Sequence, residues 1–338
     1  MVNWEPFPQG DKWQWDGLLL QSPDYTIFQS YHWGELKRGG GWEPLRWVAR
    51  GREGVPVAMV QILTRILPGH LTIGWAPGGP VLLSPVDDKG HLSDILSGLV
   101  YFGRQSFARG LVRFSNMAAY DPFASAVYEE VFDRPHHCVN SGRSVWLDLT
   151  ISMDDIYRHM SSKHRYYVKK ASKEVLEWRA GNEETLARDF SSLHREMIAR
   201  KKVSGWSGIG DISRLCHTLQ DHVCLFTGYR GDVALSSCLV LLIGQKAFYA
   251  MAASGEEGRK FGASYAMMPQ LMHHLKEKGV THLDLGGIDP AHTSARGVDH
   301  FKKGFGGKPI QYLGEWEWAS SEWLRRGLNL AIKYKFAS

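Results

Sequence analysis

Two stretches of similar layout, separated by about half the chain, constrain the fold more than any other feature of this sequence. Residues 47–62 read as two strands joined by a glycine-containing turn, and residues 224–235 have the same layout. The turn glycines Gly54 and Gly231 are 177 residues apart. Glycine suits this place because tight hairpin turns need a positive φ.

A helix, a glycine and a strand follow each hairpin. Apolar residues at helical spacing predict one helix over 91–109, ending at Gly110, and another over 264–278, ending at Gly279. These two glycines are 169 residues apart, which is nearly the same offset. Coincidence between two common units is one explanation, and duplication of a lobe is the other. Duplication predicts an α/β fold (α+β mixed sheets) of two similar lobes, with a ligand cleft between them.

The boundary between the lobes is expected near residue 149, where a strand gives way to a helix start at Ser152-Met153-Asp154-Asp155. The first domain would then cover 1–148 and the second 149–317. The last segment, 318–338, contains an amphipathic stretch, and we expect it to form a helix that packs back on the first domain.

Composition excludes several classes of function. The 338 residues include 40 Lys and Arg against 35 Asp and Glu, a net charge of +5 that is compatible with an anionic ligand but does not by itself indicate nucleic-acid binding. The four cysteines have no CxxC spacing and the 15 histidines no HExxH spacing, so we expect no disulfide framework and no metal. The N-terminus does not resemble a signal peptide and the longest apolar run is too short to span a bilayer, which predicts a cytoplasmic protein.

A first candidate site is the segment Arg259-Lys260-Phe261-Gly262-Ala263-Ser264, expected to follow a strand and open a helix. A basic residue, a glycine and free backbone N–H groups at a helix N-terminus can bind an anion. The segment nearly matches the [RQ]xxGx[GA] pattern with which acyl-CoA-dependent N-acyltransferases of the GNAT superfamily hold a pyrophosphate. An ordinary helix cap is the alternative.

A second candidate is Ser161 to Lys170, where basic residues alternate with Tyr166 and Tyr167. In a helix, Arg165 and Lys169 share one face, and Tyr166 and Lys170 share another. The segment is either a solvated helix face or a clamp for phosphates or carboxylates.

A third candidate combines Asp284-Leu285-Gly286-Gly287-Ile288-Asp289 with Phe301-Lys302-Lys303-Gly304-Phe305-Gly306-Gly307. A strand that runs into two glycines lets the backbone approach a ligand closely. If both segments end at one edge of the sheet, they bring an acid, a lysine and glycine-rich loops together. No motif for a Ser, His, Asp nucleophilic triad accompanies them.

These three elements, together with Trp33-Gly34-Glu35-Leu36-Lys37 and Ala76-Pro77-Gly78-Gly79-Pro80-Val81, resemble the FemABX family of aminoacyl-tRNA-dependent peptidyltransferases. The resemblance covers nearly the whole chain and is most specific in the third candidate. It implies two tandem GNAT-like domains, with aminoacyl-tRNA as donor, a peptidoglycan precursor or a related amine as acceptor, and no cofactor. A lipid-linked acceptor would bring the protein into peripheral contact with a membrane.

The resemblance also implies roles for individual residues. Phe301 and Lys302 would lie at the reaction centre, where Lys302 stabilises the oxyanion of the tetrahedral intermediate or neutralises the leaving ribose oxygen; a surface lysine beside a turn is the alternative. The residues implied to bind the acceptor or its phosphates, or to line the cleft, are Lys37, Trp42, Arg165, Tyr166 and Tyr249.

Two departures from the family pattern leave questions open. Either Asn116 or Asp121 could take the place of an acid that the family often has, and Asp284 and Arg259 are further candidates. The stretch 170–219 has no room for the coiled-coil arm of some members, so a compact type is expected.

The alternatives to aminoacyl transfer are an acyl-CoA-dependent N-acyltransferase of amino sugars or amino acids, a member of the family that serves natural-product or exopolysaccharide assembly, and a non-catalytic glycan- or nucleotide-binding module.

Overall fold

The computed structural model describes residues 2–8, 10–201, 211–290 and 296–337. The chain divides into two compact units, the first formed by Met1–Gly142 with Ile310–Ser338 and the second by Arg143–Pro309. The expected boundary at 148/149 would place strand β7 (Arg143–Asp148) in the first unit, whereas β7 pairs with β12 (His282–Asp284) of the second. Within the described ranges, no helix is both long enough and apolar enough to cross a membrane.

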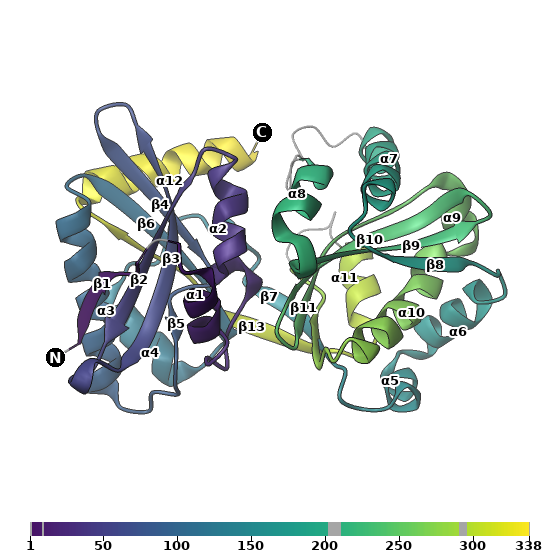
Figure 1. The fold of residues 1–338 in the computed structure, drawn as a ribbon, viewed down its shortest axis with the longest axis horizontal. Helices are drawn as coiled ribbons and strands as arrows, with labels where there is room; N and C mark the ends of the chain where they lie inside the picture. Colours follow the sequence, from purple (N-terminus) through teal and green to yellow (C-terminus); the bar gives the residue numbers. More distant parts are fainter. Residues whose placement is uncertain (1, 9, 202–210, 291–295, 338) are drawn as a thin grey trace. The chain divides into compact units, whose positions relative to one another are not determined.

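The described part of the first unit contains a sheet with the strand order β1-β2-β3-β4-β6-β13 (Figure 1). Strands β4 and β6 run parallel, and the other neighbours are antiparallel. A short strand, β5, adds to β3. The strands are β1 (Asn3–Pro6), β2 (Glu43–Arg50), β3 (Pro56–Leu67), β4 (Leu71–Pro77), β5 (Val81–Leu82), β6 (Gly110–Ala119) and β13 (Lys308–Ala319).

The second unit repeats this order as β8-β9-β10-β11-β12-β7. Here β11 and β12 form the parallel pair, and the other neighbours are again antiparallel. The remaining strands are β8 (Glu177–Gly181), β9 (Val223–Arg230), β10 (Val233–Ile243) and β11 (Lys246–Ser254). A helix precedes the second parallel strand in both units, α3 (Lys89–Ser106) before β6 and α10 (Ala263–Glu277) before β12. The duplicated α/β lobe predicted from the glycine offsets is confirmed.

The last strand of each sheet comes from the other half of the sequence. Strand β7 follows the first unit's helix α4 (Pro122–Val131) along the chain, yet it pairs with β12 of the second unit. Strand β13 follows the second unit's helix α11 (Arg296–Lys303), yet it pairs with β6 of the first. The two repeats have therefore exchanged their final strands.

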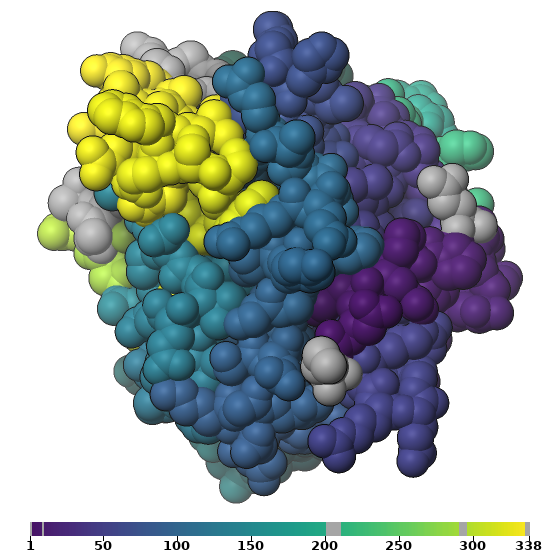
Figure 2. Space-filling model, turned by 90° about the vertical axis from the view of Figure 1, so that its left-hand side faces the viewer, coloured from purple at the N-terminus to yellow at the C-terminus, as the bar shows by residue number. Residues whose placement is uncertain are grey.

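The C-terminal helix α12 (Glu322–Ala337) contacts β6 of the first unit. Figure 2 shows the C-terminal residues in yellow against blue residues of the first half of the chain. Asn329 anchors the helix, because its buried side chain accepts a hydrogen bond from Arg113 at 2.9 Å and donates one to Glu317 at 2.7 Å. Arg113 in turn pairs with Glu317 at 2.8 Å, so each buried charge has an opposite partner.

Helices cover both sides of the sheet of the second unit. Helix α7 (Glu184–Lys201) and helix α10 both contact β9, β10 and β11, and they lie on opposite sides of these strands (Figure 1). Alternate residues of β10 face the two sides, as the period of a strand requires. The other described helices are α1 (Lys12–Leu19), α2 (Tyr31–Arg38), α5 (Met153–His159), α6 (Ser162–Ala171), α8 (Ile212–Leu219) and α9 (Glu256–Phe261).

Candidate active site

The parallel strands of the second unit diverge early. Pairing between β11 and β12 spans only Lys246–Phe248 against His282–Asp284, whereas β4 and β6 of the first unit stay paired over the six residues Thr72–Pro77. The register between β10 and β11 also shifts, because Met251 and Tyr249 face consecutive residues of β10 and Ala250 is left as a bulge. Bulges of this kind re-aim side chains beside active sites.

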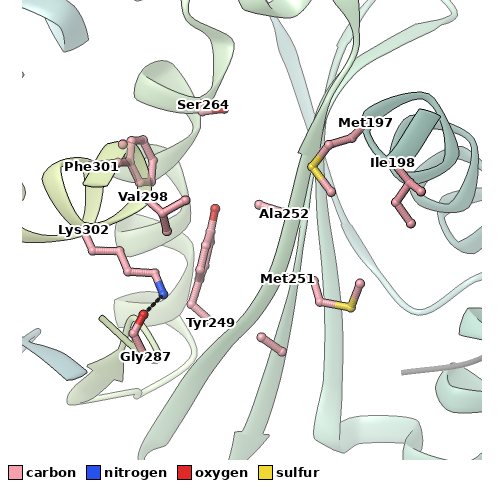
Figure 3. Close-up of a pocket in the computed structure, with 12 residues that line it drawn as sticks. Met197, Ile198, Tyr249, Met251, Ala252, Ser264, Gly287, Val298, Phe301 and Lys302 are labelled. Atoms are coloured by element: carbon pink, nitrogen blue, oxygen red, sulfur yellow. Dashed lines mark hydrogen bonds between the residues drawn. The ribbon is translucent and has the colours of Figure 1, made fainter. Parts of the chain in front are cut away.

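A pocket of about 640 Å³ opens beyond the point where these strands part. It is mostly apolar, with Lys302, Tyr249 and Ser264 as its polar side chains (Figure 3). The lining residues are Met197, Ile198, Tyr249, Ala250, Met251, Ala252, Ser264, Gly287, Gly297, Val298, Phe301 and Lys302. A concave, apolar site with a few convergent polar groups is the usual form of a small-ligand site.

Lys302 is half-buried at the C-terminal end of α11, and its ammonium donates a hydrogen bond to the carbonyl oxygen of Gly287 at 2.7 Å (Figure 3). Burial lowers the pKa of Lys302 below that of a free lysine, while Asp284 and Asp299 oppose this change. The structure therefore joins the two glycine-containing segments of the third candidate, and it keeps the lysine half-buried beside the pocket.

Asp284 supports the turn that receives Lys302. One carboxylate oxygen accepts hydrogen bonds from the Ser144 hydroxyl and from the backbone N–H of Gly286 at 2.7 Å, and the other accepts from the indole of Trp146 at 2.9 Å. Gly286 has φ +75°, a conformation that favours glycine. With both oxygens engaged, Asp284 holds the Gly286–Gly287 turn in place and is not positioned as a free base.

Tyr249 presents a buried hydroxyl to the pocket. The residue is 7% exposed, and its hydroxyl oxygen has no hydrogen-bond partner among the described residues. Burial raises the pKa of Tyr249, so the hydroxyl keeps its proton. Buried hydroxyls without a partner are rare in folded proteins, and one at a pocket wall is available to a ligand.

Phe301 reaches the pocket from α11 and also belongs to an aromatic cluster with Tyr265 and Phe305. His164 of α6 is fully buried beneath this cluster, and its Nε2 donates to the backbone carbonyl of Phe301 at 3.1 Å. The histidine ring occupies the space beside Gly304, where a Cβ would lie 1.9 Å from the ring. Gly304 therefore allows α6 and α11 to pack closely together.

Arg165 and Tyr166 lie outside this pocket. Arg165 is exposed and donates hydrogen bonds to the backbone carbonyls of Met160 and Arg158, at the end of α5. Tyr166 is 61% exposed on the outer face of α6. The pocket thus brings together Tyr249, Phe301 and Lys302 of the predicted residues.

Lys37 and Trp42 belong to the first unit, so they are described separately from this pocket. Lys37 lies on α2 with its ammonium 4.5 Å from the centroid of the Trp33 ring. Trp42 follows α2, and the Arg65 guanidinium lies 4.8 Å from the centroid of its ring. Both are cation–π contacts on half-buried side chains.

The remaining candidates have structural partners. Arg259 donates to the Ser254 carbonyl at 2.6 Å and to Glu196 at 3.3 Å. The segment from Arg259 to Phe261 was expected to open a helix, but it forms the last turn of α9, and Gly262 with φ +81° joins α9 to α10. Asn116 donates to the hydroxyl of Tyr128 at 3.1 Å, and Asp121 caps the N-terminus of α4.

Sequence analysis missed the wall of the pocket opposite Lys302, which Met197 and Ile198 of α7 supply (Figure 3). A signal was present, because Leu186, Phe190, Leu193 and Met197 recur at the spacing of one helix face. That spacing indicates a residue facing the sheet. Whether it packs on a strand or borders a pocket depends on how far the strands beneath it remain paired.

The chemistry of the pocket is that of charge stabilisation. Among the residues that the structure describes, its lining includes no cysteine, histidine or carboxylate, and the Ser264 hydroxyl is hydrogen-bonded to Ser254 at 2.8 Å. Lys302 and Tyr249 can both donate hydrogen bonds to an oxygen that gains negative charge. The described residues therefore suit attack by an external nucleophile on an activated carbonyl, without a covalent enzyme intermediate.

Comparison with known proteins gives matches in both sequence and structure. A sequence model described as the FemAB family matches residues 211–333. A UDP-N-acetylmuramoylpentapeptide-lysine N(6)-alanyltransferase from Weissella viridescens is 25% identical over 324 residues, which cover 89% of this chain and 91% of the relative.

The fold has solved counterparts. A crystal structure of FemX matches with a TM-score of 0.82 at 16% identity, covering 96% of this chain and 100% of that chain. A tandem GNAT protein from the clavulanic acid biosynthesis pathway matches with a TM-score of 0.57 at 11% identity, covering 95% and 99% of the two chains. The tandem GNAT-like fold is thereby confirmed.

Proposed function

Because the chain belongs to the FemABX family, we propose that it is an aminoacyltransferase, which transfers an aminoacyl group from aminoacyl-tRNA to an amine of a peptidoglycan precursor. The observation that carries the proposal is the pocket of the second unit, where Lys302 faces an apolar cavity together with the Tyr249 hydroxyl, which has no hydrogen-bond partner in the described part of the chain. The relative from Weissella viridescens is named for alanyl transfer to the lysine N6 of such a precursor, over nearly the same length of chain.

The proposed reaction needs little from the protein beyond binding and charge stabilisation. The neutral amine of the acceptor attacks the ester carbonyl of the donor, and the carbonyl oxygen becomes an oxyanion. The carbonyl then re-forms as the bond to the ribose oxygen breaks, and the proton that the amine gives up ends on that departing oxygen. Lys302 and Tyr249 donate to that oxyanion, and one such donor is typically worth about 3 kcal/mol in the transition state. The ester is already activated, so no cofactor enters the proposal.

The pocket would hold the aminoacyl group. Its apolar wall, with Met197, Met251 and Val298, suits a small amino-acid side chain, and its volume of about 640 Å³ leaves room for the attacking amine. Holding both reactants in an attack geometry is the largest contribution that such an enzyme can make besides electrostatics.

We assign acceptor binding to Lys37 and Trp42 of the first unit, as the family resemblance implies. Lys37 is a cation on a short helix, and the Trp42 ring beside it offers an aromatic face. These residue types suit the phosphates and the base of a nucleotide-linked acceptor.

Acyl transfer from acyl-CoA is less well supported. The basic residue of the acyl-CoA pattern, Arg259, is engaged with Glu196 and with the backbone of Ser254. Incubating the protein with UDP-linked muramoyl pentapeptide and either mixed aminoacyl-tRNA or acetyl-CoA, followed by mass spectrometry, tests the proposal. We expect the acceptor to gain the mass of one amino-acid residue when aminoacyl-tRNA is the donor, and to gain no mass when acetyl-CoA is the donor. An acetyl adduct, or no adduct with any charged tRNA, would overturn it.

A further inference from the structure

The segment 162–173 contains five lysine and arginine residues and no aspartate or glutamate. It therefore carries a positive charge equal to the net charge of the whole chain, which is +5. Most of this segment is helix α6. The proposed reaction centre uses none of these cations.

Helix α6 separates its apolar and cationic sides. His164, Val168 and Ala171 are buried, and the helix contacts α10. The exposed lysines, with Tyr166 among them, form what we call the α6 basic face, which consists of Lys163, Tyr166, Lys169, Lys170 and Lys173. Arg165 is also exposed, but it is hydrogen-bonded to the end of α5 and is not counted in this face. The packing side of the helix is thus occupied by the protein's own core, and the basic face is turned to solvent.

The lysines of the α6 basic face have no carboxylate partner within the described part of the chain, whereas two nearby arginines, Arg158 and Arg230, do. Arg158 pairs with Asp155, and Arg230 pairs with Glu174 at 2.7 Å. Glu174, the acid that follows Lys173, is therefore already engaged. Four lysines without counter-charges in two to three helical turns attract a polyanion.

We infer that the α6 basic face binds the sugar-phosphate backbone of RNA, namely the acceptor arm of the aminoacyl-tRNA donor; this inference rests on the proposed function. Lysines at intervals of three and four residues present cations to successive phosphates along one face. Tyr166, 61% exposed among them, offers a ring on which an unpaired base can stack.

The face lies one helix layer from the candidate active site. His164 on its buried side is hydrogen-bonded to the carbonyl of Phe301, which lines the pocket. Tyr167 contacts Tyr265 with ring centroids 4.9 Å apart, and the adjacent Ser264 also lines the pocket. An RNA whose charged 3′ end enters the pocket can therefore continue over α6.

The surface chemistry favours RNA over an anionic membrane. Helices that lie in a membrane interface insert an apolar face among the lipids. The apolar side of α6 is buried against α10, and the basic face offers one aromatic ring without aliphatic side chains beside it.

Replacing Lys163, Lys169, Lys170 and Lys173 together by Gln tests the inference. The matched control replaces Lys89, Lys278, Lys308 and Lys333, which removes the same charge elsewhere on the surface. The probe is bulk tRNA without an attached amino acid, and its dissociation constant is measured over a range of KCl concentrations. If all four lysines contact phosphates, the slope of log affinity against log salt should fall by about 3 in the α6 variant. Affinity at low salt should fall at least about tenfold, and the control should keep the slope of the wild-type protein.

Equal slopes for the two variants would overturn the inference. A different outcome is that the α6 variant loses binding to equimolar phosphatidylglycerol–phosphatidylcholine vesicles while its salt slope for tRNA stays that of the wild-type protein. That result would also overturn the inference, and it would identify an anionic membrane as the ligand of the α6 basic face. Transfer by the wild-type protein is measured alongside. If the wild-type protein transfers the aminoacyl group but the α6 variant keeps the wild-type salt slope for tRNA, the inference about α6 is wrong while the proposed function stands. If no charged tRNA supports transfer, the proposed function fails, and this inference fails with it.

Discussion

His164 donates its Nε2 proton to the backbone carbonyl oxygen of Phe301 over 3.1 Å, and it thereby ties α6 to the residue that precedes Lys302. Its other ring nitrogen lies 2.9 Å from the hydroxyl of Ser161, which donates to it when the ring is neutral. Burial lowers the pKa of His164, which favours that neutral form. His164 is thus a positioning residue for the end of α11.

His164→Gln should preserve more activity than His164→Ala. The glutamine amide can still donate to the Phe301 carbonyl, whereas alanine leaves that oxygen without its partner, at a cost of about 1–3 kcal/mol in stability. Thermal denaturation and turnover of both variants check this. Equal turnover of the two variants, at equal stability, would show that the hydrogen bond does not position α11.

Lys302→Met should lower kcat about a hundredfold or more while leaving the fold intact, because the methionine keeps much of the aliphatic stem and removes the charge. The effect should fall on kcat more than on KM, since the charge it stabilises develops in the transition state. Lys303→Met is the control, because Lys303 is exposed and does not line the pocket. Turnover at the wild-type rate in both variants would exclude Lys302 from the chemistry.

Turnover should fall as the pH rises, and the fall should begin at a lower pH than the pKa of an ordinary exposed lysine would give. Burial lowers the pKa of Lys302, so its ammonium loses the proton earlier than an exposed lysine as pH rises, and the donor loses its charge. Initial rates across the alkaline range measure this. The residual activity of Lys302→Met should lack the falling limb, and a limb that persists in that variant would assign it to another group.

Tyr249→Phe should separate stability from activity. Removing a buried hydroxyl that has no partner among the described residues should leave the free energy of unfolding unchanged or raise it slightly. Transfer should nevertheless fall, by about a hundredfold for the loss of one oxyanion donor worth about 3 kcal/mol in the transition state. Denaturant unfolding and steady-state kinetics are the two measurements. Unchanged kinetics would mean that the hydroxyl does not touch the reactants.

Gly304→Ala should destabilise the protein, whereas Gly297→Ala should not. A Cβ at Gly304 would lie 1.9 Å from the His164 ring, while a Cβ at Gly297 meets no atom within 4 Å. Overpacking of this kind typically costs about 1–3 kcal/mol, and alanine within α11 favours the helix. Urea denaturation of both variants provides the comparison. Equal stability would contradict the close packing of α6 on α11.

Much of the fold could be predicted because its signals are local. The hairpin around Gly54 and the one around Gly231 have their own turn glycines, and α10 ends beside Gly279, which has φ +77°. The end predicted for the first helix at Gly110 was wrong, because α3 stops at Ser106 and Gly110 already belongs to β6. The exchange of β7 and β13 has no such signal, because an apolar strand pattern does not specify which half of the chain supplies its partner. Strand pairing between distant segments is decided by the assembled sheet.

The residues of the candidate site also fall into those that a local motif identifies and those that the packing of the fold decides. Lys302 and Phe301 stand in a specific motif, so the sequence was sufficient to single them out. Arg165 and Tyr166 were also singled out, but the buried stripe of α6 runs through His164 and Val168, which turns both outward. The early divergence of β11 from β12 could not be predicted, because it depends on the register of a parallel pair.

The exchanged strands set an order of events during synthesis. The second unit is contiguous in the chain, whereas the first lacks β13 until the ribosome has made residue 319. At 5–20 residues per second, the edge of β6 stays without its partner for roughly 10–40 s after β6 itself is complete. The N-terminal half therefore emerges first but closes its sheet last, and its open strand edge during that interval is the place where a nascent chain of this kind would aggregate or recruit a chaperone.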